Sequence, residues 1–194
     1  MGRPREHDDT VRLALLLAAE RLVSEHGPAG LSARNVADAV ETTTRAVYSV
    51  FGSMNGLLEA LATRLFELLD EALDAVVLTN DPVADVITAS IEGFRHVALA
   101  HTPLYNLVFL RVVPDLKLGP GFQTVATTTF GRLERLVQRV GEAESIVTSD
   151  LARTVHALTE GLATMELRGA LGPPEQAERV WRLALGTLLA GAAA

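Results

Sequence analysis

Residues 31–51 read LSARNVADAVETTTRAVYSVF and carry the signals of two short helices joined by a tight turn. Ser32 and Thr43 each stand just before a helix-like segment, where a side-chain hydroxyl can cap exposed backbone N–H groups. Glu41 and Thr42 fall between the two segments and form the turn. The apolar residues that we expect on the inner side are Val36, Ala37 and Val40 in the first helix, Val47 in the second, and Phe51 just beyond it.

A longer helix precedes this pair. Residues 10–26 place apolar side chains on one broad face, and Gly27 follows as a typical C-terminal glycine. Two short helices braced by a longer one make up a helix-turn-helix. Because the second helix of that motif lies in the major groove, we expect Thr43, Thr44 and Arg45 to face base edges.

The rest of the chain also predicts helices. Apolar residues recur at spacings of three and four nearly throughout, and Gly and Pro residues interrupt the pattern. We therefore expect an all-α fold with a three-helix head over residues 1–54 and a larger helical body over residues 55–194. The nine helices expected are 10–26, 32–39, 43–49, 54–78, 83–101, 103–112, 121–141, 149–170 and 174–191.

Composition excludes several classes of protein. The chain has 194 residues, 48% of them apolar, which is enough to bury a core without cross-links. It contains no cysteine, so disulfide frameworks, thiolate zinc sites and cysteine nucleophiles are excluded. No apolar run reaches the ~18 residues that a bilayer span needs, and the polar N-terminus does not resemble a signal peptide, so we expect a cytoplasmic protein with no membrane partner.

Three segments of the head form a recognisable set. They read Leu15-Leu16-x-Ala18-Ala19-x-x-Leu22-Val23-x-Glu25-x-Gly27, Leu31-Ser32-x-Arg34-x-Val36-Ala37 and Val47-Tyr48-x-x-Phe51-x-Ser53-x-x-x-Leu57-Leu58. Over residues 10–60, this set resembles the TetR family of bacterial transcriptional repressors. The resemblance implies a DNA-binding head and a C-terminal domain that dimerises and holds a small-molecule effector.

The resemblance also implies which head residues contact DNA. Arg3 and Arg5 form a basic arm that can reach into a minor groove, or else a solvated tail. Tyr48 is expected at a phosphate, the alternative being a core aromatic with a wet hydroxyl. The full set expected on or near the DNA comprises Ser32 and Tyr48 at phosphates and Arg34, Thr43, Thr44, Arg45 and Ser49 at the groove.

Three head residues depart from the family pattern. Glu41 stands where glycine is usual, Val50 where histidine is usual, and Met54 where lysine is usual. Glu41 brings a Cβ and a negative charge to the turn, which costs strain if the turn needs a positive φ. Met54 removes a cationic phosphate contact.

Charge is distributed unevenly along the chain. The formal net charge is −7, which at first argues against DNA binding. Residues 1–60 hold six basic and eight acidic side chains, and residues 61–194 hold eleven and sixteen, so most of the acidity lies on the body. Because residues 32–54 are neutral as a group, we expect modest DNA affinity with a shallow salt dependence.

The last two helices carry stripes suited to a homodimer interface. The alternative is that these stripes face only their own core. Residues 101–109 and 161–169 resemble the body of a TetR subgroup marked by Trp followed by His-Gly, although this chain has Glu160-Gly161 and no such Trp. The expected interface residues are Leu151, Val155, Leu158, Leu162, Met165, Trp181, Leu185 and Leu188.

The middle helices supply candidates for an effector pocket, which we expect to suit an apolar or amphipathic molecule. At each position, the alternative is plain core packing. His156 and Glu160 stand one helical turn apart, but two ligands are too few for a metal site. The candidates are Phe94, His101, Tyr105, Phe109, Phe122, Phe130, His156 and Glu160.

No catalytic or cofactor motif is found in the sequence. We therefore predict a non-enzymatic dimeric regulator, acting as a repressor, that binds a palindromic double-stranded DNA operator and is released by a small effector without a cofactor. The alternative is a helical ligand-binding or partner-binding protein whose head no longer reads DNA, and Glu41 and Met54 are the residues that keep this alternative open.

Overall fold

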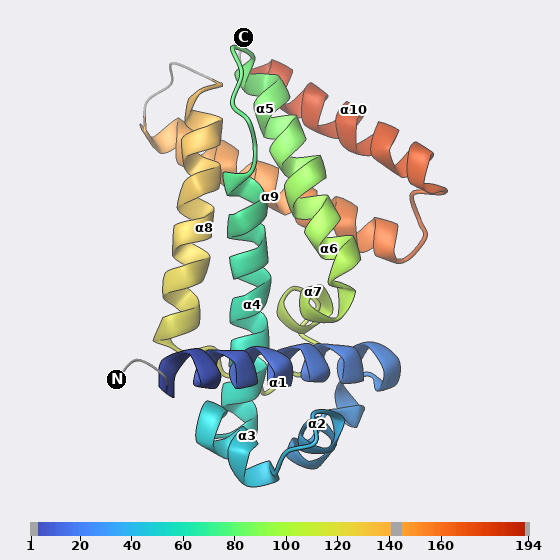
Figure 1. Ribbon diagram of the computed structural model, residues 1–194. Helices are drawn as coiled ribbons and strands as arrows, with labels where there is room; N and C mark the ends of the chain where they lie inside the picture. Colours follow the sequence, from blue (N-terminus) through green and yellow to red (C-terminus); the bar gives the residue numbers. More distant parts are fainter. Residues whose placement is uncertain (1–3, 141–144, 193–194) are drawn as a thin grey trace. The chain divides into compact units, whose positions relative to one another are not determined.

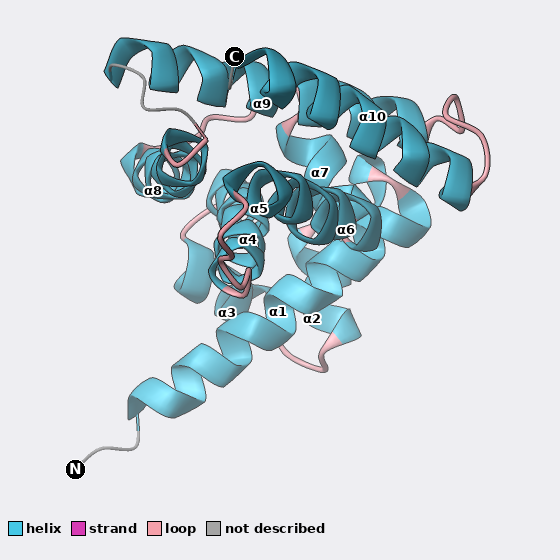
Figure 2. Ribbon diagram, turned by 90° about the horizontal axis from the view of Figure 1, so that it is seen from above, coloured by secondary structure: helices cyan, strands magenta, loops and turns pink. Residues whose placement is uncertain are grey.

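The computed structural model describes the backbone of residues 4–140 and 145–192 and the side chains of residues 9–140 and 148–191. Within these ranges the chain is helical and contains no strand (Figures 1 and 2). None of the helices described there is long and apolar enough to cross a membrane. The elements are α1 (Pro4–His26), η1 (Pro28–Gly30), α2 (Ala33–Ala39), α3 (Thr44–Phe51), α4 (Met54–Asp74), α5 (Pro82–Thr88), η2 (Ala89–Arg95), α6 (His96–Ala100), α7 (Thr102–Val108), α8 (Pro120–Gln138), α9 (Ser145–Leu167) and α10 (Pro174–Ala192).

The nine-helix prediction is confirmed for the described residues, since α5, η2 and α6 follow one another without a break. The η2 segment is a single stretch of π-helix, a type of distortion that is rare and often found at functional positions.

Several predicted helix ends were wrong. The first helix begins at Pro4 rather than at residue 10, because proline needs no N–H partner in a first turn. The helix predicted over 54–78 ends at Asp74, because the N–H and hydroxyl of Thr79 bind the side chain of Asp85 and hold the connecting segment in a non-helical path. The helix predicted over 103–112 ends at Val108, and Arg111 beyond it has a positive φ of 48°.

The described residues of 1–65 and 103–123 form one compact unit, called unit 1. In it, α1 runs across α2, and α2 packs on α3 (Figure 1). The unit also includes α7, so a helix from the middle of the sequence belongs to the same packed group as the helix-turn-helix. Its most deeply buried side chains include Leu15, Ala19, Val36, Val47, Leu57, Leu61, Leu104 and Tyr105.

Residues 66–102 and the described residues of 124–194 form unit 2. Here α9 and α10 lie along each other, α10 contacts α5, and α9 contacts η2 and α6 (Figure 2). The division into these units cuts α4 after residue 65, so it differs from the functional division into 1–54 and 55–194, which stays a prediction. The core of unit 2 includes Val86, Val155, Ala163, Trp181, Leu185 and Leu189.

Candidate nucleic-acid interface

The two helices of the predicted helix-turn-helix begin at the expected hydroxyl caps. The backbone N–H of Asn35 donates to Ser32 Oγ at 3.1 Å, and the N–H of Ala46 donates to Thr43 Oγ1 at 3.2 Å. Each hydroxyl still has its own hydrogen, which can be donated to an external oxygen such as a phosphate. The capping role and the expected phosphate contact of Ser32 are therefore compatible.

The turn between α2 and α3 places Glu41 in a backbone conformation that residues other than glycine disfavour. Glu41 has a φ of 54°, in the left-handed region where a side chain with a Cβ costs about 1–2 kcal/mol. The N–H of Thr42 donates to the carbonyl of Ala37 at 2.9 Å and closes the turn. The strain expected from Glu41 in place of glycine is therefore present.

Burial on one side leaves the other side of the motif in solvent. Val36 and Ala37 of α2 and Val47 of α3 are almost completely inaccessible, and α1 covers α2. This packing fixes the two helices, so the side chains on their outer surface are presented by a rigid support.

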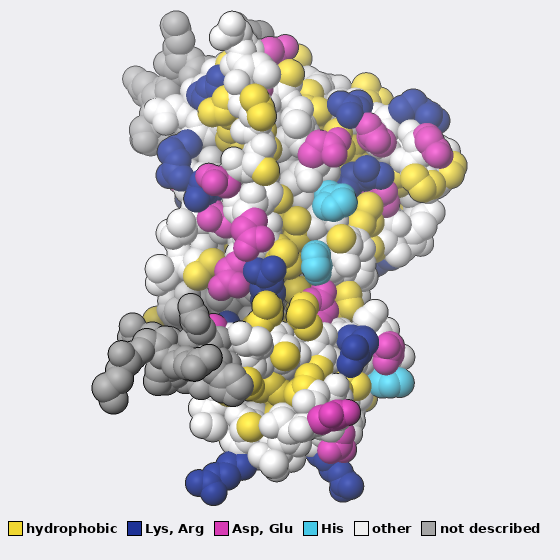
Figure 3. All heavy atoms as spheres, in the orientation of Figure 1, with side chains coloured by type: hydrophobic (Ala, Val, Ile, Leu, Met, Phe, Trp, Pro, Cys, Tyr) yellow, Lys and Arg dark blue, Asp and Glu magenta, His cyan; other side chains and the backbone are white. Residues whose placement is uncertain are grey.

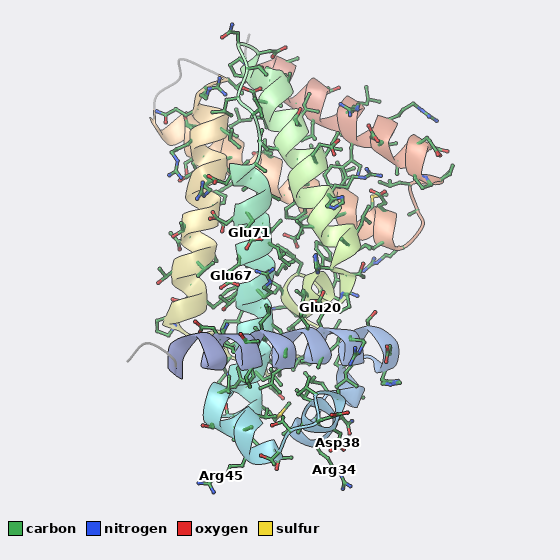
Figure 4. All side chains as sticks on the ribbon, in the orientation of Figure 1. Glu20, Arg34, Asp38, Arg45, Glu67 and Glu71 are labelled. Atoms are coloured by element: carbon green, nitrogen blue, oxygen red, sulfur yellow. The ribbon has the colours of Figure 1, made fainter. Side chains whose placement is uncertain are left out.

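The outer surface carries the residues expected to contact DNA. Arg34 and Arg45 project into solvent from the end of unit 1 formed by α2 and α3 (Figure 4), and Figure 3 shows Lys and Arg side chains in dark blue at that end. Tyr48 is 47% exposed, which excludes the alternative of a buried core aromatic. Thr43, Thr44 and Ser49 are exposed beside it, and Ser32 is half-buried.

Cationic charge on this surface is sparse. Arg34 lies 3.8 Å from Asp38 one helical turn away, with 85% and 70% of the two side chains exposed. Arg45 makes no hydrogen bond or ion pair with any residue that the structure describes. The surface therefore offers one unpaired guanidinium, well suited to a guanine edge or a phosphate, together with a group of hydroxyls.

The expected basic arm falls largely outside what the structure describes. Arg3 lies outside the described residues. Arg5 lies in the first turn of α1, but its side chain is outside the described range. An arm role for either residue stays a prediction.

The connection from α3 to α4 is held by contacts that the sequence did not reveal. Ser53 caps α4 by accepting a hydrogen bond from the N–H of Gly56 at 2.9 Å. The side chain of Asn55 donates to the carbonyl of Lys117 at 2.9 Å and accepts from its N–H at 3.1 Å. Because these partners are 62 residues apart, no local pattern could have found the pair.

The predicted effector residues fall into two groups. Tyr105, Phe109 and Phe122 belong to unit 1, where Tyr105 is buried and its ring centroid lies 4.9 Å from that of Phe109. Phe94, His101, Phe130, His156 and Glu160 belong to unit 2.

Within unit 2, His156 gathers three of the other predicted residues. Its ring lies edge-on to Phe94 and Phe130, with centroids 6.2 and 6.1 Å apart, and Glu160 Oε2 is 3.9 Å from its Nε2. Burial lowers the pKa of His156 below its ordinary value, and the Glu160 carboxylate only partly offsets this. At neutral pH the ring is therefore uncharged, with a hydrogen on one nitrogen and a lone pair on the other.

Only part of the predicted dimer stripe reaches the surface. Val155, Leu162, Trp181 and Leu185 are buried within the chain and leave little or no side-chain surface for a partner. Leu183, which the stripe did not include, is 72% exposed on α10. The accessible members of the predicted set are Leu151, Leu158, Met165 and Leu188.

Trp181 takes part in a buried polar cluster instead. Its indole N–H donates to Glu166 at 2.9 Å, and Arg95 donates to the same carboxylate through Nε at 2.9 Å and Nη2 at 2.7 Å. The Arg95 and Glu166 side chains are only 14% and 9% exposed. This carboxylate therefore joins η2 to α9 and α10, the two helices that carry the predicted dimer surface.

A capped helix-turn-helix whose second helix, α3, is exposed, within a described chain that is otherwise helical, is the arrangement of a DNA-binding transcriptional regulator. Residues 15–61 match the family model described as bacterial regulatory proteins, tetR family, and residues 87–188 match the tetracyclin repressor-like C-terminal domain. The chain belongs to the TetR family of transcriptional regulators. No curated protein sequence matches it.

Solved structures share the fold over nearly the whole chain. A protein of unknown function from Rhodococcus sp. RHA1 is 26% identical, with a TM-score of 0.76 over 93% of this chain and 94% of that one. BioQ from Mycobacterium smegmatis is 23% identical, with a TM-score of 0.64 over 92% and 95%. An Acinetobacter baumannii TetR variant in complex with minocycline is 17% identical, with a TM-score of 0.65 over 91% and 93%.

Proposed function

We propose that the protein is a homodimeric repressor that binds a palindromic operator through α3 and is released by a small organic effector. The observation that carries the proposal is the exposed group of Arg34, Arg45 and Tyr48 on a capped, rigidly supported helix pair. A structure of BioQ with its natural double-stranded DNA operator, 23% identical with a TM-score of 0.64 over 94% of this chain and 98% of that one, supports it. As a DNA-binding regulator, it would act in the cytoplasm.

We expect a dimer because a single helix-turn-helix contacts too few base pairs to specify an operator. A single head reads only a few base pairs, whereas two heads related by a two-fold axis read half-sites about 34–36 Å apart or a multiple of that distance. The exposed apolar residues of α9 and α10, notably Met165 and Leu183, offer a surface for the partner subunit. Apolar side chains on α9 include both buried and exposed residues, so this helix can pack against its own chain on one side and against a partner subunit on another.

We assign the effector contact to the group around His156. Two aromatic rings packed against an uncharged imidazole suit an apolar molecule. Release from DNA then requires the effector to bind the DNA-incompetent arrangement more tightly than the competent one, because equal affinity shifts no equilibrium.

Selection from random double-stranded DNA by the full chain at low salt tests the proposal. We expect enrichment of a palindromic or near-palindromic site and a dimer by sedimentation analysis. If no site is enriched, the DNA-reading role fails, and the protein is a helical ligand-binding or partner-binding member of its family. If a site is enriched but the protein sediments as a monomer, the dimer proposal fails alone.

A further inference from the structure

One cleft of unit 2 is lined by both apolar and basic side chains and contains none of the predicted effector residues. It lies between the end of α4, the segment that follows it, and α8, and its cavity volume is about 260 Å³. Ligand pockets usually measure ~300–1,000 Å³, so this cleft suits a small molecule. Its lining comprises Leu73, Asp74, Val76, Leu78, Arg132, Arg135, Leu136 and Arg139.

The wall formed by residues 76–78 is held in place. The N–H and hydroxyl of Thr79 donate to the buried carboxylate of Asp85, and Arg139 bridges that carboxylate and the carbonyl of Thr79. Burial alone raises the pKa of Asp85, but the hydrogen bonds from Thr79 and Arg139 outweigh it and keep that pKa below its usual value. The carboxylate thus stays ionised, and the cleft is preformed.

Three arginines line the cleft and differ in their partners: Arg132 and Arg135 lie on α8, and Arg139 directly follows its last residue. Arg132 forms ion pairs with Asp70 and Asp74, and Arg139 is bound to Asp85 as described. Arg135, between them, is exposed and makes no hydrogen bond or ion pair with residues in the described part of the chain. One guanidinium therefore remains available beside an apolar wall.

We propose that this cleft binds a small amphipathic organic anion, whose carboxylate or phosphate pairs with Arg135 while its apolar chain covers Leu73, Val76 and Leu78. A guanidinium recognises carboxylates and phosphates through paired N–H donors, which explains the preference for an anion. Leu78 is 53% exposed, so contact with a hydrocarbon chain removes apolar surface from water. The site does not depend on DNA binding or on the group around His156.

Calorimetric titration of the full chain with octanoate tests the site. We expect a dissociation constant below about 1 mM for octanoate. Binding should be much weaker for octan-1-ol, which has no charge, for octylammonium, which has a positive charge, and for acetate, which has no hydrocarbon chain. Arg135→Gln should weaken octanoate binding at least tenfold, Arg135→Lys should weaken it less, and Leu78→Ser should weaken it severalfold.

Arg153→Gln is the matched control, because Arg153 is an exposed arginine of unit 2 that does not line the cleft. This variant should bind octanoate as the unchanged protein does. Trp181 emission and urea unfolding check that each variant is folded. Absence of octanoate binding, equal binding by Arg135→Gln, or equal binding of octan-1-ol would each overturn the assignment.

Discussion

The indole N–H of Trp181 on α10 donates a 2.9 Å hydrogen bond to the carboxylate of Glu166 on α9, and both side chains lie inside unit 2. The same carboxylate receives two hydrogen bonds from Arg95 of the π-helical segment. A buried carboxylate with three donors is well satisfied, and its position fixes three helices relative to one another. This pair stabilises the helices from inside rather than contributing surface to a partner.

Replacement of Glu166 should expose the importance of this cluster. Glu166→Ala leaves Arg95 and the indole N–H of Trp181 buried without their acceptor, so we expect the free energy of unfolding to fall by about 3 kcal/mol. Glu166→Gln keeps one acceptor oxygen and should lose less. Trp181 is the chain's single tryptophan, so its emission in urea titrations reports directly on this site.

The matched control is Glu175→Ala, an exposed glutamate in the first turn of α10. It should change the free energy of unfolding by no more than about 0.5 kcal/mol. Equal losses in Glu166→Ala and Glu175→Ala would contradict the role assigned to the cluster.

Relief of the strained turn should stabilise the head. Glu41→Gly removes the Cβ from a residue with a φ of 54°, and we expect a gain of about 1 kcal/mol in the free energy of unfolding. Glu41→Ala removes the same charge but keeps the Cβ, so it should show no such gain. Equal gains in both variants, measured by urea unfolding, would assign the effect to charge rather than to backbone strain.

Sequence reasoning succeeded where the signal is local. Ser32 and Thr43 were identified as caps because their spacing to the next N–H groups is fixed by helix geometry. Likewise, Glu41 was identified as a source of strain because the family pattern places glycine there.

It succeeded less where the partner is distant in sequence. The spacing of Val155, Trp181 and Leu185 shows that one side of each helix is buried, but not against what, and these side chains turn out to be buried within the chain itself. The Asn55–Lys117 and Arg139–Asp85 contacts join residues more than 50 positions apart, and no periodicity encodes them.

The environment of His156 predicts a pH dependence of stability. Burial lowers its pKa in the folded state below the ordinary value of 6.5. Above pH 6.5 the ring is neutral in both states and contributes nothing. As pH falls below 6.5, the unfolded chain takes up the proton first, so the free energy of unfolding decreases until the folded-state pKa is passed.

Urea unfolding at pH 7.5 and 5.5 measures this effect. His156→Gln removes the titrating ring, so we expect this variant to lose less stability between the two pH values than the unchanged protein. His96→Gln, which removes an exposed histidine of the same unit, should behave like the unchanged protein. An identical pH dependence in His156→Gln and the unchanged protein would contradict the assignment.

Two substitutions on α3 should separate the reading of bases from the positioning of the helix on DNA. Arg45→Ala removes the unpaired guanidinium, so we expect it to weaken binding to the selected operator by about 1–3 kcal/mol and to reduce discrimination against altered base pairs. Tyr48→Phe removes a neutral hydroxyl, so it should weaken binding to all sequences about equally and leave the salt dependence unchanged.

Binding to the operator and to single-base variants of it, measured at several salt concentrations, distinguishes the two roles. Arg179→Ala, an exposed arginine on α10, controls for general loss of charge and should leave site preference unchanged. If Arg45→Ala keeps the full base preference of the unchanged protein, the guanidinium binds phosphate rather than a base edge, and its loss should then lower the salt slope by about one unit instead.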